Sequence, residues 1–188
     1  SGGGSLDIVS GVTTLGGGTG FTGTVSVSGG SLNATGSVTL TGAVTNAATL
    51  TIADSTTFTS DALTNNGAGT VGIGNGSILE GTGNTLNNNA VINVGNNGSI
   101  VEVAAGDINN NATGIINFNG AVATTATMQV NTGAINNSGA INIVGAGDVQ
   151  ITGPLTNNGA GTITGGGGNV TLTGTLQNAG TITLGTSS

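Results

Sequence analysis

The fold is decided by short stretches in which an aliphatic residue precedes asparagines, small residues and a second aliphatic pair. They read LNNNAVINV at residues 86–94, INNNATGIINF at 108–118 and INNSGAINI at 135–143. Seven copies occur, and their first aliphatic residues are Val44, Leu63, Leu86, Ile108, Ile135, Leu155 and Leu176. From residue 44 to residue 176 is 132 residues in six steps, a mean of 22. Such a period indicates a repeat architecture.

Each repeat contains three aliphatic stretches separated by Gly, Asn and Thr. The second stretch alternates with period two, as in Ile92 and Val94, and so does the third, for which we expect Val101 and Val103 to be one inward pair. Alternation places one face in a core and the other in solvent. The sequence therefore predicts an all-β parallel β-helix, or β-solenoid, with about three short strands per roughly 22-residue rung and one continuous aliphatic core.

The chain is expected to form a single continuous domain with a less regular start. Residues 1–37 are predicted to hold irregular N-terminal strands or first coils, and residues 38–188 the regular solenoid. From Val44 onward, the distance from the first aliphatic residue to the second strand alternates between six and eight residues. Alternate corners are therefore predicted to bulge by two residues.

Asparagine recurs at one corner of the repeat, and two interpretations of it stay open. The amides can stack into a ladder along the axis, or each can shape its own turn by Asx-type bonding. The residues predicted to stack are Asn65, Asn88, Asn110, Asn137, Asn158 and Asn178.

The composition excludes much chemistry. The 188 residues include no Lys, Arg, His, Cys, Trp or Tyr, and seven acids give a net charge of −7. Without basic side chains the electrostatic basis of nucleic-acid binding is missing, and without His and Cys the usual zinc, haem and iron–sulfur ligands are missing. No apolar run is long enough for a membrane helix. We expect no enzyme activity, no catalytic residues, no cofactor, no metal and no membrane insertion.

The few polar groups offer only weak candidate sites. A period near 22 could stack Glu80 above Glu102 and attract a cation, although solvated surface acids are the favoured interpretation. Six glycosylation sequons begin at Asn33, Asn75, Asn97, Asn111, Asn136 and Asn169. The three phenylalanines, Phe21, Phe58 and Phe118, are expected in the core rather than in a sugar-binding platform.

Two segments, residues 21–32 (FTGTVSVSGGSL) and 169–184 (NVTLTGTLQNAGTITL), resemble the β-helical repeats of bacterial autotransporter passengers. They are also similar to filamentous-haemagglutinin-type adhesins and large cell-surface repeat proteins. This resemblance implies a right-handed β-helix that is secreted and located outside the cell or at its surface. It assigns no functional residue.

The ends of the repeat array lead to a functional hypothesis. The last repeat stops after Ile182 and Leu184, before a third strand, and Leu6 and Ile8 with Val12 are interpreted as the strand type that is missing there. Solenoid ends expose unpaired backbone and apolar core. The sequence thus predicts a homopolymer: a structural subunit that assembles head to tail, its N-terminal strand completing the neighbour's last rung. The assembly residues are Leu6, Ile8, Val12, Leu176, Ile182 and Leu184.

Two alternatives remain. The chain can be a fragment cut from a longer repeat protein, such as the shaft or passenger of an adhesin, a binding module that recognises cell-surface or matrix glycans. It can also be an ice-binding solenoid, because Thr-x-Thr tripeptides recur. They begin at Thr39, Thr49, Thr162, Thr171 and Thr181, and we expect them to fall in different columns of the rung.

Overall fold

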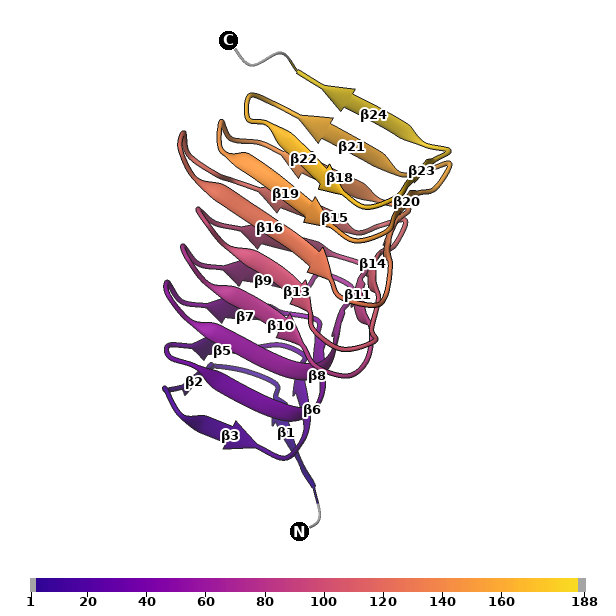
Figure 1. The fold of residues 1–188 in the computed structure, drawn as a ribbon. Helices are drawn as coiled ribbons and strands as arrows, with labels where there is room; N and C mark the ends of the chain where they lie inside the picture. The colour runs from indigo at the N-terminus through magenta and orange to yellow at the C-terminus, as the bar shows by residue number, and fades with distance from the viewer. Residues whose placement is uncertain (1–2, 186–188) are drawn as a thin grey trace.

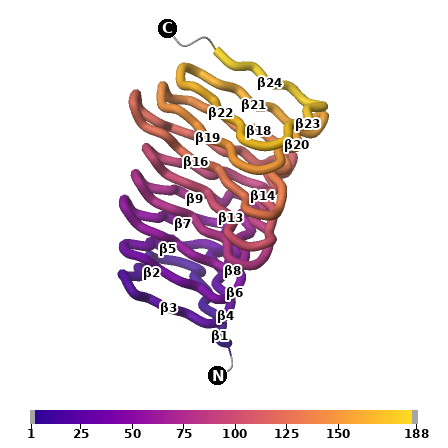
Figure 2. Tube along the Cα trace, viewed as in Figure 1, coloured from indigo at the N-terminus to yellow at the C-terminus, as the bar shows by residue number. Residues whose placement is uncertain are grey.

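The computed structural model describes residues 3–185 and shows a β-solenoid of about nine turns. Its strands are parallel, each coil contributes three of them, and the coils stack from the N-terminal to the C-terminal end in one direction (Figure 1). The chain trace follows the same continuous winding (Figure 2). The predicted all-β parallel solenoid is confirmed. Residues 1–2 and 186–188 of the two predicted segments lie outside the described residues.

The strands form three faces, named here in the order in which the chain meets them. The first face holds β1 (Gly4–Ile8), β4 (Gly23–Val27), the C-terminal parts of β6 (Val38–Asn46) and β8 (Thr57–Asn65), β11 (Leu86–Asn88), β14 (Ile108–Asn110), β17 (Ile135–Asn137), β20 (Leu155–Asn157) and β23 (Leu176–Asn178). The second face holds β2 (Val12–Leu15), β5 (Ser31–Ala34), β7 (Thr49–Ile52), β9 (Thr70–Ile73), β12 (Val91–Val94), β15 (Ile115–Phe118), β18 (Ala140–Ile143), β21 (Thr162–Gly165) and β24 (Thr181–Leu184). The third face holds β3 (Thr19–Phe21), the N-terminal parts of β6 and β8, β10 (Ile78–Gly81), β13 (Ser99–Glu102), β16 (Thr125–Val130), β19 (Asp148–Thr152) and β22 (Val170–Thr173).

The predicted aliphatic columns pair in register through the whole stack. Leu63 lies beside Leu86, Leu86 beside Ile108, and Ile108 beside Ile135. All four side chains are at most 2% exposed. Burying one such side chain contributes roughly 1.5–3 kcal/mol, and because each coil is thin, the contribution depends on its neighbours above and below.

The first coils already follow these columns. Val25 pairs with Val44 on the first face, and Leu32 pairs with Leu50 on the second. The register that the sequence left open in the first 37 residues is therefore the register of the later coils.

The strand type predicted for the N-terminus was wrong. Leu6 pairs with Val25, and Val25 pairs with Val44, so β1 belongs to the first face. The third strand of that coil is β3, where Phe21 pairs with Leu40. The four-residue spacing between Ile8 and Val12 resembled a third-to-first step, but in the structure it is a corner between the first and second faces.

The inward pair predicted for β13 was also wrong. Ile100 pairs with Leu79 and Met128, which are both buried core residues, and this pairing turns Ile100 and Glu102 inward. Val103 is 40% exposed. Because successive side chains alternate between faces, a one-residue difference in phase exchanges the buried and exposed sets. Glu102 is consequently a core residue.

The alternating corner lengths are confirmed as two-residue bulges. Leu50, Val71 and Ile92 share one column although six, eight and six residues separate them from the preceding first-face residue. Each long corner closes with the same backbone bond, in which the N–H of Gly69, Gly114 or Gly161 donates to a carbonyl three residues earlier. The extra residues therefore leave the strands in line.

Asparagines form a buried ladder at the corner between the first and second faces. From Asn46 to Asn157, each Nδ2 donates to the Oδ1 of the asparagine in the next coil at 2.7–2.9 Å. Each of these Nδ2 groups also donates to a backbone carbonyl of that next coil, as from Asn110 to Ala140 at 3.0 Å. This asparagine column comprises Asn46, Asn65, Asn88, Asn110, Asn137, Asn157 and Asn178.

The ladder prediction is confirmed with one correction, since Asn157 and not Asn158 occupies the column. Asn158 Nδ2 instead donates to Ser138 Oγ at 2.9 Å. Local Asx bonding is also present, because the N–H of Ala90 donates to Asn88 Oδ1 at 3.3 Å.

Candidate assembly ends of the solenoid

The C-terminal end of the solenoid presents three strands with one free edge each. Within the described residues β22 pairs only with β19, β23 only with β20, and β24 only with β21. Their outer edges carry unpaired N–H and C=O groups, which form a template for another strand.

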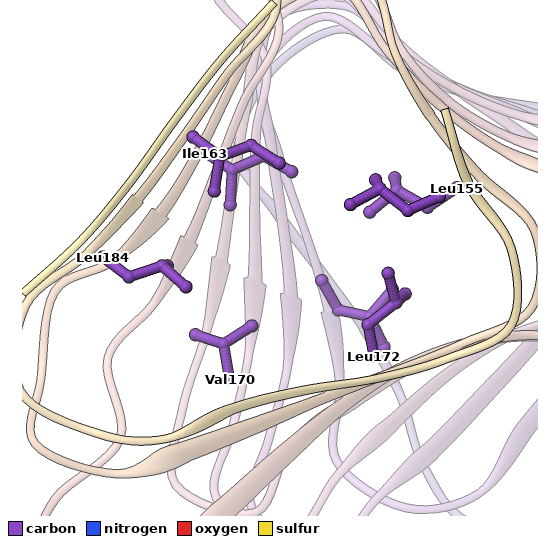
Figure 3. A pocket seen from close by; sticks show the side chains of 8 residues that line it. Leu155, Ile163, Val170, Leu172 and Leu184 are labelled. Atoms are coloured by element: carbon purple, nitrogen blue, oxygen red, sulfur yellow. The ribbon is translucent and has the colours of Figure 1, made fainter. Parts of the chain in front are cut away.

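The core is open at this end. Figure 3 shows aliphatic side chains directed inward from all three faces around a hollow. The volume of this hollow is about 100 Å³. Its lining is entirely aliphatic: Ile151, Leu155, Ile163, Val170, Leu172, Leu176, Ile182 and Leu184. Leu176 is 46% and Leu184 51% exposed, whereas Leu155 and Ile143, which lie in the same two columns of earlier coils, are each 3% exposed. Among the described residues, no further coil covers the side chains of Leu176 and Leu184.

The N-terminal end is the counterpart. Among the described strands β1 pairs only with β4, β2 only with β5, and β3 only with β6. Leu6, Leu15 and Phe21 lie half-buried against the core, one from each face, and Ile8 is buried. This end too leaves core side chains only partly covered.

The structure separates the predicted assembly residues into two groups, one at each end, and the side chain of Val12 belongs to neither group. Leu176, Ile182 and Leu184 lie together around the C-terminal hollow, and Leu6 and Ile8 lie at the opposite end. Val12 is 67% exposed and points outward from the second face, so it is not part of the core edge.

Sequence reasoning missed several end residues. Val170 and Leu172 bring the third face to the hollow, and Leu15 and Phe21 complete the N-terminal edge. Val170 and Leu172 alternate as strand residues do, but they precede the last repeat, which begins at Leu176 and from which the predicted C-terminal interface was taken. At the N-terminus the incorrect strand type concealed the role of Leu15.

The three faces do not contain the same number of strands. Within residues 3–185, the first and second faces each hold nine strands, whereas the third holds eight. When β1 of one copy is placed over β23 of another, and β2 over β24, an opening one strand wide remains between β22 and β3. Because β1 lies on the first face, an N-terminal strand that continued the stack in this register would begin a new coil rather than supply a third-face strand.

The lateral faces of the solenoid carry fewer candidate binding features than its two ends. Phe58 and Phe118 are fully buried and Phe21 is half-buried, so the expected core role of the phenylalanines is confirmed for the first two. A shallow hollow of about 290 Å³ is lined by residues of the second face and the turns that follow it, among them Thr51, Asp54, Gly72 and Asn93. No aromatic side chain lines it.

The expectation that the Thr-x-Thr tripeptides fall in different columns was partly wrong. Those that begin at Thr49, Thr162 and Thr181 share the two outward columns of the second face. Val91 and Ile115 interrupt one of these columns, so no continuous threonine array forms.

Other expected sites do not assemble. Glu80 pairs with Val101 rather than with Glu102, so the predicted stack of the two glutamates was wrong. Within residues 3–185 no three acidic side chains gather closely enough to hold a metal ion. In this same part of the chain, no helix has the length and apolar character needed to span a membrane.

The chain matches no protein-family model, no curated protein and no solved structure. A function must therefore be inferred from its own residues and geometry.

Proposed function

We propose that the chain is a structural subunit of an extracellular or cell-surface filament in which copies stack end to end. The observation that carries this proposal is the open aliphatic hollow at β22–β24, which has free strand edges on all three faces. The free edges of β1 and β2 belong to the same columns as β23 and β24.

Continuing the register across the joint places leucine over leucine at two inward positions and threonine over isoleucine at a third. Leu6 of one copy would lie over Leu176 of the next, Thr13 over Ile182, and Leu15 over Leu184. The asparagine column also continues in part, because Asn157 Nδ2 donates to the carbonyl of Thr181 at 3.4 Å. Asn178 Nδ2 would meet the carbonyl of Val12, which begins the equivalent strand.

A contact between two different ends does not close on itself, so it extends into a filament. Neighbouring coils are about 4.8 Å apart along the axis, and stretching the rod must break backbone ladders on every face. The opening between β22 and β3 leaves the third face unpaired, which makes each joint weaker than an interior coil.

An extracellular position is supported by the composition and by the resemblance to surface β-helical repeats. The sequence contains no Lys or Arg, so it has no cleavage site for trypsin-like proteases. It also lacks the readily oxidised residues Cys, Trp, Tyr and His. These absences suit a polymer that is exposed outside the cell.

Sedimentation velocity and negative-stain imaging at neutral pH test the proposal. We expect the wild-type chain to form filaments with concentration, and Leu184→Asp to stay a single rod because a charge would enter the joint. The matched control is Val122→Asp, which places the same charge at a residue that is 76% exposed between β15 and β16. Single rods of wild-type protein at every concentration, or equal disruption by the control, would overturn the proposal.

A further inference from the structure

A second buried polar column lies at the corner between the third and first faces. Its inward positions hold Leu40, Ser60, Gly81, Glu102 and Val130 in successive coils. A Cβ atom at Gly81 would coincide with the carboxylate of Glu102. The Glu102 side chain thus occupies the space that glycine leaves, on the side of the column toward Ser60.

The polar atoms of this column have no partners. Glu102 is 0% exposed and Ser60 is 1% exposed. Neither Glu102 Oε1, Glu102 Oε2 nor Ser60 Oγ makes a hydrogen bond to any described residue. A buried ionised carboxylate without a partner costs several kcal/mol. The sequence contains no basic side chain that could offset this charge.

The surrounding residues add negative charge. Burial first, and then the carboxylates of Asp107 and Asp61, raise the pKa of Glu102 to about 7. Asp61 Oδ2 accepts a hydrogen bond from Asn84 Nδ2 at 2.9 Å, and Asp107 Oδ1 accepts one from the N–H of Ala134 at 2.8 Å. These bonds hold both acids at the corner.

We propose that the Ser60–Gly81–Glu102 corner binds one hard cation of the calcium class. The Glu102 carboxylate and Ser60 Oγ would be its side-chain ligands, and the charges of Asp61 and Asp107 would attract it. Ca²⁺ accepts carboxylate, hydroxyl and carbonyl oxygens together. Because only one carboxylate is central, the expected affinity is weak, with a Kd of about 10⁻⁴–10⁻³ M, as in extracellular modules.

Calorimetric titration of the whole chain with CaCl₂ at pH 8 tests this site. We expect saturable binding of one ion per chain and a rise in Tm with Ca²⁺. Both effects should disappear in Glu102→Gln, which keeps the size of the side chain, and circular dichroism would establish that this variant is folded. Lowering the pH to 6 should weaken binding, because protons then compete for the same carboxylate.

The matched control is Glu80→Gln, which removes an acid from the neighbouring strand β10 but from its outward face. This variant should bind Ca²⁺ as the wild type does. No saturable binding to the wild type would show that the carboxyl is neutralised by a proton alone. Equal losses in both variants would indicate diffuse attraction to an acidic rod. Either result would overturn the site.

Discussion

The two buried polar columns of this solenoid differ in whether their side chains are hydrogen-bonded. In the asparagine column each amide both donates and accepts, so identical residues in successive coils satisfy one another. In the Ser60–Gly81–Glu102 column the carboxylate can only accept, and its neighbours do not donate to it. Stacking therefore stabilises a buried amide, whereas a buried acid needs a group that the fold does not supply.

Converting one amide of the ladder into an acid should have the largest effect. Asn110 Nδ2 donates to Asn137 Oδ1 at 2.8 Å and to the carbonyl of Ala140 at 3.0 Å. Asn110→Asp would lose both donors and bury an unpaired charge, so we expect a loss of about 3–5 kcal/mol in the free energy of unfolding. Urea denaturation monitored by circular dichroism at neutral pH measures it.

The control for that substitution is Asn109→Asp on the same strand. Asn109 points outward, is half-buried and donates to Asn87 Oδ1 at 3.2 Å. Its loss should be about 1 kcal/mol. Equal losses at Asn109 and Asn110 would contradict the role assigned to burial of the ladder.

Stability should depend on pH through Glu102. Its pKa is raised from 4.5 to about 7, so between these values the folded state holds a proton that the unfolded state has released. The contribution of this bound proton to the free energy of unfolding is fully present below pH 4.5 and is lost as the pH rises through 7. In the absence of divalent cations, this loss is about 3 kcal/mol.

Denaturation curves between pH 4 and 8 in EDTA, compared with Glu102→Gln, isolate this contribution. The variant should lack the part of the pH dependence that comes from residue 102. A wild-type curve that follows the variant throughout would mean that Glu102 does not titrate in this range.

The smallest effect is expected at Ser60. Its hydroxyl is buried without a partner, so Ser60→Ala removes a desolvated group and should change the free energy of unfolding by less than about 1 kcal/mol in EDTA. In Ca²⁺ the same variant should be less stabilised than the wild type. A large loss in EDTA would show that the hydroxyl has a structural role of its own.

The repeated columns could be predicted from the sequence. The prediction failed where it had to decide which of two alternating sets of residues faces inward. The columns through Leu63, Leu86 and Ile108 were recognisable because inward aliphatic residues recur beside asparagine at nearly constant spacing. The ladder was predicted for the same reason, with an error only where Asn157 and Asn158 are adjacent.

Glu102 could not be found in this way, because Val101 and Val103 alternate as well as Ile100 and Glu102 do. Only the pairing of Ile100 with Leu79 and Met128 decides which set faces inward. At the N-terminus, Leu6 and Ile8 carry a strand signal that is compatible with any face. Their assignment comes from the strand beside them, which is a long-range property.

The bulged corners give one edge of the rod a different period from the rest of its surface. Turns at Gly67, Thr113 and Gly159 project from every second coil, so this edge repeats over about 9.6 Å, twice the strand spacing. The other two corners change in length without this alternation: 8 residues separate Ile92 from Ile100, but 12 separate Ile116 from Met128 in the next coil. A ligand bound along the bulged edge would therefore contact alternating long and short turns. Equivalent positions for it along this edge would be two coils apart.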